Sequence, residues 1–175
     1  MILVANRELH DLGIGNLEPL LKIIDASLSP IHKAINTAGI GNGESNCEQA
    51  EYLIGVGFCA IQKYLFDVLQ DIKIDVGLAR DLGPKSNKGI AIARLIHSAA
   101  NYWKHEPEWH IWLEELKPNS QKTIDETLHG KDFADYPLSE LLADLCNGNT
   151  LSLSGCLPYL KEWRAAVYKH TSKNS

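Results

Sequence analysis

The stretch Asn87–His105, NKGIAIARLIHSAANYWKH, has the hydrophobic period of an amphipathic helix. At about 100° per residue its apolar side chains share one side, and its polar side chains fall within a stripe roughly 120° wide. The apolar side consists of Ile92, Leu95, Ile96, Ala99 and Trp103. The polar stripe consists of Asn87, Arg94, His97, Ser98, Asn101, Lys104 and His105. We expect this helix to pack on a core and to present the polar stripe to water, a cleft or a partner.

The rest of the chain also predicts helices, and no sustained two-residue alternation indicates a sheet. Asn16 is the expected N-cap of the first helix, Ser29-Pro30 is expected to kink or divide it, and Ser45 and Glu48 have the spacing of a capping box. The expected helices, besides the one above, span 17–38, about 45–71, 108–116, 120–129, 138–146 and 155–170. The sequence therefore predicts an all-α bundle of about five to seven helices, folded as one domain over 1–175 with a frayed tail at 171–175.

Two glycines lie inside the second of these helices, where each costs about 1 kcal/mol relative to alanine. Gly55 and Gly57 therefore need a compensating role. Close approach of a neighbouring helix is the role that we expect, in preference to a hinge.

The net charge of the chain limits the classes of molecule that we expect it to bind. The formal net charge of the 175 residues is -5, which argues against broad electrostatic capture of nucleic acid. A local basic stripe on an acidic body can still hold a few phosphates. The polar stripe contains cations but no carboxylate, so it is the place where we expect such binding.

The cysteines and the termini point to no metal, cofactor or membrane. Four cysteines lie apart without a CxxC pair or a zinc-finger grouping. His105 and His110 lie near Glu106 and Glu108, but Pro107 breaks the helical spacing that a metal site there would need. Neither a signal peptide nor a run of 18 apolar residues is evident, so we expect a cytoplasmic protein without a membrane segment, a metal or a cofactor.

The polar stripe has the groups that metal-free phosphodiester cleavage requires: a histidine to move protons, a cation to stabilise charge, and an amide to orient the phosphate. His105 is the candidate general acid/base, Asn101 the orienting amide, and Arg94 or Lys104 the cation. Further candidate binding residues are His97, Ser98 and Tyr102. The alternative is a solvated helix face whose polar side chains bond to a neighbouring loop, with Tyr102 at the rim of the core.

The run Asn101-Tyr102-Trp103-Lys104-His105 on a helix of an all-α bundle resembles the HEPN superfamily, whose members are often RNA-cleaving toxins or antiviral effectors. The usual motif is an arginine, a small polar residue, three variable residues and a histidine. Asn101 and His105 match this motif, whereas Ala100 stands at the arginine position. The resemblance implies RNA binding, metal-independent endoribonuclease activity of a toxin or defence type, and a site built across two copies of a helix.

Three tryptophans lie within ten positions: Trp103, Trp109 and Trp112. Tryptophan is enriched at interface centres, so we expect a homodimer through the region of Trp109 and Trp112. This region also supports the alternative function, a non-catalytic protein–protein interaction module of the same fold that has lost its active site at Ala100. A third hypothesis is a small-molecule pocket between helices, near Gly55, Gly57 and the polar stripe.

Overall fold

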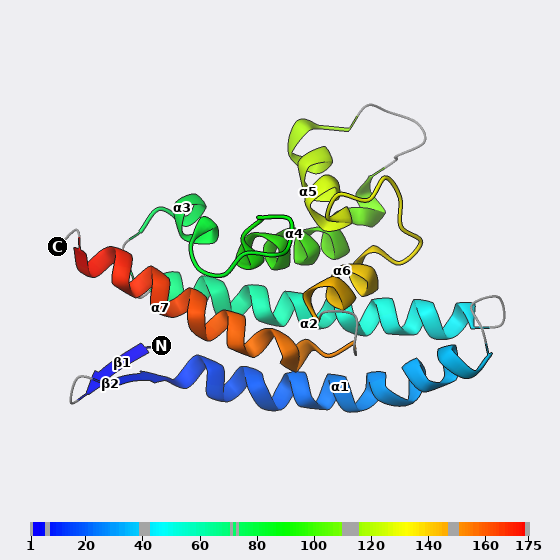
Figure 1. The fold of residues 1–175 in the computed structure, drawn as a ribbon, viewed down its shortest axis with the longest axis horizontal. Coiled ribbons are helices and arrows are strands. Elements are labelled where there is room, and N and C mark those ends of the chain that lie inside the picture. The colour runs from blue at the N-terminus through cyan, green and yellow to red at the C-terminus, as the bar shows by residue number, and fades with distance from the viewer. Residues whose placement is uncertain are drawn as a thin grey trace.

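The computed structural model describes residues 2–5, 8–38, 43–70, 72, 74–109, 116–146 and 151–173. In these ranges the chain forms an all-α bundle preceded by a short β-hairpin (Figure 1). The strands are β1 (Ile2–Ala5) and β2 (Glu8–Asp11), and two 3₁₀ turns are η2 (Glu106–Glu108) and η3 (Leu153–Cys156). The α-helices are α1 (Leu12–Ala38), α2 (Glu44–Gln70), α3 (Val76–Asp81), α4 (Ile92–His105), α5 (Pro118–Leu128), α6 (Pro137–Leu145) and α7 (Leu157–Lys173). The predicted class, a helical bundle of five to seven helices, is confirmed.

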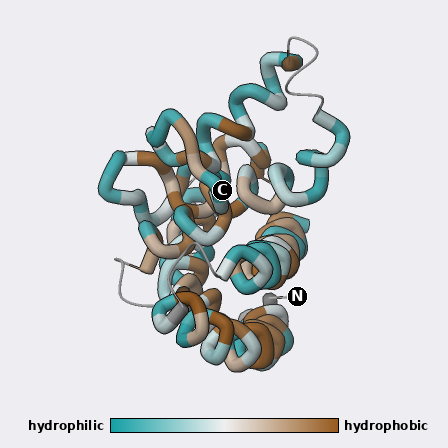
Figure 2. Tube along the Cα trace, turned by 90° about the vertical axis from the view of Figure 1, so that its right-hand side faces the viewer, coloured by the Kyte–Doolittle hydropathy of each residue, from teal (hydrophilic) through white to brown (hydrophobic). Residues whose placement is uncertain are grey.

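The long helices α1 and α2 run antiparallel and form the base of the bundle in Figure 1. α4 packs on α2 and carries α5 on its other side. The largest fully buried side chains, Phe58 of α2 and Trp163 of α7, belong to one hydrophobic core shared by these elements. Teal and brown stretches alternate along the helical tubes in Figure 2, as amphipathic packing requires.

The β-hairpin and the start of α1 differ from the sequence-based expectation. β1 and β2 pair antiparallel with Ile2 opposite Asp11, and α1 begins directly after β2. The carboxylate of Asp11 accepts a hydrogen bond from the backbone N–H of Ile14 at 3.0 Å, so it satisfies a free donor of the first turn. Asn16, the expected N-cap, lies inside the helix.

The long helices differ from the expectation in two further ways: α1 continues through Pro30, and α2 and α4 begin at other residues than expected. α1 continues through Pro30 because Leu28 and Ile31 on either side are both buried in the core, and this packing outweighs the lost hydrogen bond. α2 begins at Glu44, so Ser45 lies inside its first turn and does not cap it. α4 begins at Ile92, five residues later than expected.

A closed loop replaces the first turn that we expected for the helix at 87–105. The backbone N–H of Ser86 donates to the carbonyl of Ile90 at 2.8 Å, and Gly89 adopts a φ of 77°. This left-handed glycine turns the chain before the helix can start. Asn87 therefore lies exposed in the loop and is not a member of the helical polar stripe.

The shorter helices lie close to their expected positions. α5 and α6 agree with 120–129 and 138–146 within two residues. The expected helix at 108–116 falls mostly on residues 110–115, which lie outside the described residues; of its described residues, Glu108 ends η2, and Trp109 and Leu116 lie in no helix. α7 continues to Lys173 and so includes three residues of the expected frayed tail, while 174–175 lie outside the described residues.

The close approach expected at the two helical glycines is confirmed. A Cβ atom at residue 55 would lie 2.0 Å from Cδ1 of Trp103, and one at residue 57 would lie 2.2 Å from Cδ1 of Leu153. Both contacts are far below van der Waals distance. Glycine at these positions therefore lets α4 and η3 pack directly on the backbone of α2.

One of the described helices, α2, is long and apolar enough to cross a membrane by length and composition alone. Half of its most apolar window is buried inside the bundle, as in a core helix. The finding is weak evidence for a membrane span.

Candidate functional site

The centre of the polar stripe is held by a residue of the neighbouring helix. The side chain of Gln62, buried on α2, lies against α4 and contacts three of its polar side chains. Its Nε2 is 2.9 Å from His97 Nδ1 and 3.0 Å from Asn101 Oδ1, and its Oε1 accepts a hydrogen bond from Lys104 Nζ at 2.8 Å. Asn101 Nδ2 lies 2.9 Å from His97 Nε2 and closes the network. Three stripe residues therefore converge on one buried amide.

This network keeps His97 neutral. Burial, followed by the positive charges of Arg80, Lys104 and Arg94, lowers its pKa from 6.5 to about 4. Both ring nitrogens face amide NH2 groups, and a protonated ring would direct an N–H at each of them. Geometry and charge therefore agree that the imidazole is uncharged at neutral pH.

Arg94 lies outside this network. Its guanidinium binds Asp81 of α3 in a bidentate pair, with Nε and Nη2 at 2.6 and 2.5 Å from the two carboxylate oxygens. Glu126 of α5 lies 3.6 Å from Nη1. Two carboxylates thus compensate the cation that sequence reasoning assigned to a phosphate, because α3 and α5 bring acidic groups that the period of α4 does not reveal.

Ser98 does not face open space, in contrast to the expected stripe. Its residue is 4% exposed, and its hydroxyl donates to the carboxylate of Glu126. α5 packs over this part of α4 and covers it. Ser98 therefore joins two helices in the structure.

At the C-terminal end of α4, Asn101 and His105 line a common pocket of about 250 Å³. The pocket is also lined by polar residues of α5, Asn119, Ser120 and Thr123, and by Glu108 and Trp109. The His105 side chain is 48% exposed, and its Nδ1 lies 3.3 Å from Glu108 Oε1. Two of the three candidate catalytic residues are thus brought together, whereas Arg94 is not among the residues that line this pocket.

Tyr102 and Trp109 form the aromatic edge of this region. Their rings meet edge to face with centroids 5.6 Å apart. Burial, with the nearby charges of Glu106 and Glu51, raises the pKa of Tyr102 to about 12. Tyr102 is therefore a half-buried packing residue at the rim, and Trp112, the second tryptophan expected at a dimer interface, lies outside the described residues.

Sequence reasoning missed Gln62, the residue that organises the network. It lies on an apolar helix, 35 residues before His97, and no motif marks it. The available signal was a lone amide between Ile61 and Tyr64 on a face that is otherwise buried. A polar side chain at such a position needs partners, which here come from α4.

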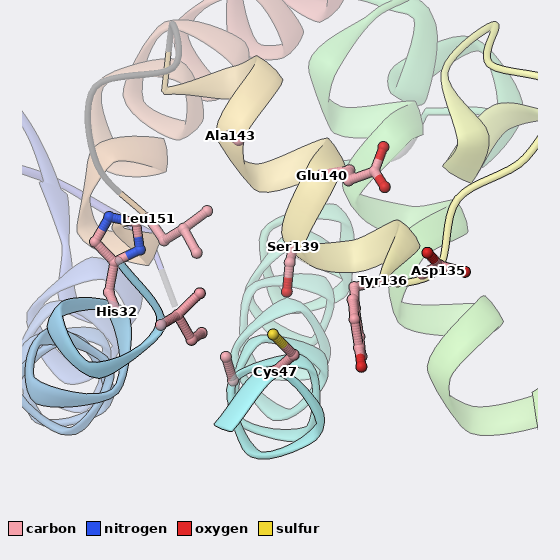
Figure 3. A pocket seen from close by; sticks show the side chains of 10 residues that line it. His32, Cys47, Asp135, Tyr136, Ser139, Glu140, Ala143 and Leu151 are labelled. Carbon is pink, nitrogen blue, oxygen red and sulfur yellow. The ribbon is translucent and has the colours of Figure 1, made fainter. Parts of the chain in front are cut away.

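A second, more apolar pocket of about 350 Å³ lies between α1, α2 and α6 (Figure 3). His32 of α1, Cys47 of α2 and Ser139 of α6 contribute to its wall, with Tyr136 and Glu140 beside them. Trp103 and Leu153 fill the space directly over Gly55 and Gly57, whereas a third pocket of about 770 Å³ lies beside Trp103 and is also lined by Lys104 and Tyr102. Sequence periodicity could not locate the pocket in Figure 3, because it arises where three helices meet.

In the described part of the chain, no three histidine, cysteine or acidic side chains are grouped so that they could hold a metal ion. Comparison with protein-family models, curated proteins and solved structures finds no match for this chain.

Proposed function

We propose that the C-terminal half of α4 binds RNA. The observation that supports this proposal is the position of Asn101, which contacts the network of Gln62 and His97 on one side and lines the pocket of His105 on the other. The contacts with Gln62 and His97 fix the orientation of the Asn101 amide toward a ligand in the pocket. Lys104 supplies a cation on the same helix face, and among the described residues it binds the uncharged Gln62 and no carboxylate.

The activity that we propose is metal-independent cleavage of RNA by internal attack of the 2′-hydroxyl on the phosphate. His105 acts as general acid/base, Asn101 orients the phosphate, and Lys104 offsets the developing charge. The order of Asn101 and His105 on α4 resembles the HEPN superfamily, in which such a site is built across two copies of a helix. Ala100 is fully buried, so no side chain at the arginine position reaches the pocket from the same copy.

The test is degradation of single-stranded RNA by the purified protein in the presence of a chelator. His105→Ala is expected to reduce the cleavage rate by about 100-fold or more. His32→Ala is the matched control, because His32 lies on α1 at the other pocket. Intact RNA after incubation with the wild-type protein would overturn the cleavage proposal.

Binding needs a separate measurement, because an inactive protein can still hold RNA. Fluorescence anisotropy with a labelled RNA is expected to show affinity that falls with salt concentration. Asn101→Ala is expected to weaken binding several-fold, with Asn119→Ala as a variant of the opposite pocket wall. Absence of binding at low salt would overturn the RNA proposal.

A second candidate is a non-catalytic protein–protein interaction module of the same fold. It is favoured by the pairing of Arg94 with Asp81 and by the burial of Ala100, which together leave the pocket without an arginine. In this case Trp109→Ala disrupts association, whereas His105→Ala changes nothing. Because a homodimer through the region of Trp109 is expected under either candidate, ultracentrifugation tests the dimer, and the RNA cleavage assay separates the candidates: only the ribonuclease cleaves RNA and loses this activity in His105→Ala.

A further inference from the structure

Three residues from separate segments form a hydrogen-bonded series that the RNA proposal does not use. Ser86 lies in the loop before α4, His129 ends α5, and Asp144 lies on α6. Ser86 Oγ is 2.9 Å from His129 Nε2, and His129 Nδ1 is 3.1 Å from Asp144 Oδ2. The atoms match those of a serine–histidine–aspartate triad, in which the serine and the carboxylate bind opposite ring nitrogens.

The carboxylate determines which ring nitrogen of His129 carries the proton. Burial acts to raise the pKa of Asp144, but hydrogen bonds from His129 and Lys131 outweigh it, and the pKa lies below its usual value. The ionised carboxylate therefore accepts the Nδ1–H of the ring. Nε2 keeps its lone pair toward the Ser86 hydroxyl, as a general base requires.

The base, His129, is buried, whereas the nucleophile, Ser86, is accessible from solvent. The His129 side chain is 1% exposed, whereas Ser86 is partly exposed and its neighbours Asn87 and Lys88 are exposed. Among the described residues, the backbone N–H of Asn87 has no protein acceptor. It is the N–H that follows the nucleophile, the position that supplies an oxyanion donor in serine hydrolases.

A strained backbone holds the histidine in this place. His129 has a φ of 51° and a ψ of 44°, a left-handed conformation that few residues other than glycine adopt. The Lys88 ammonium donates to its carbonyl and ties the loop of Ser86 to the end of α5. His129 is the left-handed C-cap of α5, and its hydrogen bonds to Ser86 and Asp144 hold the ring in one orientation.

We propose that Ser86 is an acyl-accepting nucleophile with His129 as its general base and Asp144 as the positioning residue, acting on carboxylic esters. Ser86 Oγ bonds to the ester carbonyl carbon while its proton passes to His129 Nε2. The bond from carbon to the alcohol oxygen then breaks, and this oxygen takes the proton from Nε2. Water attacks the acyl-serine in the same way, which releases the carboxylic acid and restores the Ser86 hydroxyl.

The experiment uses a fluorophosphonate reagent and p-nitrophenyl acetate on the full chain. Wild-type protein is expected to react with the fluorophosphonate at one site, which peptide mass spectrometry places on Ser86, and to release p-nitrophenol. Ser86→Ala is expected to abolish the labelling. Ser27→Ala, which changes an exposed serine of α1, is expected to leave it intact.

Asp144→Asn tests whether the series is catalytic or only structural. An asparagine keeps the size of the side chain but favours the wrong tautomer of His129, so the labelling rate is expected to fall by about 10²- to 10⁴-fold. Circular dichroism of the variant establishes that it remains folded. Wild-type protein that stays unlabelled, label found elsewhere, or folded Asp144→Asn protein that labels at the wild-type rate would each overturn the proposal.

Discussion

The indole ring of Trp103 lies directly on the backbone of Gly55, where an added Cβ would be 2.0 Å from Trp103 Cδ1. The ring of Tyr52 meets the same indole edge to face at 5.5 Å and limits its movement. Gly55→Ala is therefore expected to lower the free energy of unfolding by about 1–3 kcal/mol, although alanine is the better helix former. Urea denaturation followed by circular dichroism measures this change.

Gly15 provides the matched control. It also lies inside a long helix, α1, but a Cβ there would meet nothing within 4 Å. Gly15→Ala is expected to stabilise the protein by up to about 1 kcal/mol. If Gly55→Ala were as stable as Gly15→Ala, the packing explanation for Gly55 would be wrong.

Glu51 of α2 supports the start of α6 from outside that helix. Its carboxylate accepts the backbone N–H groups of Leu138 and Ser139 at 2.7 and 2.9 Å, and the Ser139 hydroxyl at 2.6 Å. Burial raises the pKa of Glu51 despite these hydrogen bonds, which lower it. Glu51→Gln is expected to cost about 1–3 kcal/mol in thermal or urea unfolding, because an amide offers one oxygen where two are used.

The control for this substitution is Glu48→Gln, at an exposed position of the same helix. It is expected to change stability by less than about 0.5 kcal/mol. An equal loss in both variants would show that net charge, and not the cap of α6, is responsible.

The helices could be predicted because their signals are local. Hydrophobic periodicity located α4, α5 and α6, and the cost of glycine in a helix pointed to the packing at Gly55. Helix ends were harder, because tertiary contacts decide them. Asp11 caps α1 from the end of a strand, and buried Leu28 and Ile31 carry the same helix across Pro30.

The candidate site could be predicted only in part, since its partners come from other elements. The spacing of Asn101 and His105 predicted that both side chains share one face of the helix, and both line one pocket. The acidic partner of Arg94, Asp81, lies 13 residues away on α3, and Gln62 lies on α2 without any motif. The hydrophobic period of one helix predicts which of its side chains share a face, but it does not predict which side chains of another helix pack against them.

The pair of Arg94 and Asp81 leads to a prediction about affinity. Asp81→Asn removes one of the two carboxylates that compensate Arg94, so the α4 face becomes more positive. RNA affinity measured by anisotropy at low salt is expected to rise by about two- to fivefold, consistent with a partly exposed ion pair. Asp67→Asn, which removes the partner of Lys63, adds the same charge at a different place and is expected to have a smaller effect.

The lowered pKa of His97 leads to a prediction about how stability depends on pH. Its pKa is about 4 in the folded protein and 6.5 when exposed, because burial and then the charges of Arg80, Lys104 and Arg94 disfavour the imidazolium. Between these values the unfolded chain binds a proton that the folded protein does not, so stability falls as the pH decreases from about 6.5 to about 4. His97→Gln is expected to flatten this fall in urea titrations made across that range.

Comparing the stability of the wild-type protein with that of the His97→Gln variant isolates the contribution of His97, because the other titrating groups are common to both. The raised pKa of Glu51 acts in the opposite direction, since a carboxyl that is easier to protonate in the folded state stabilises it at low pH. This contribution is the same with and without His97 and cancels in the difference. A difference that does not change between pH 6.5 and pH 4 would contradict the neutral, amide-bound imidazole that the network around Gln62 implies.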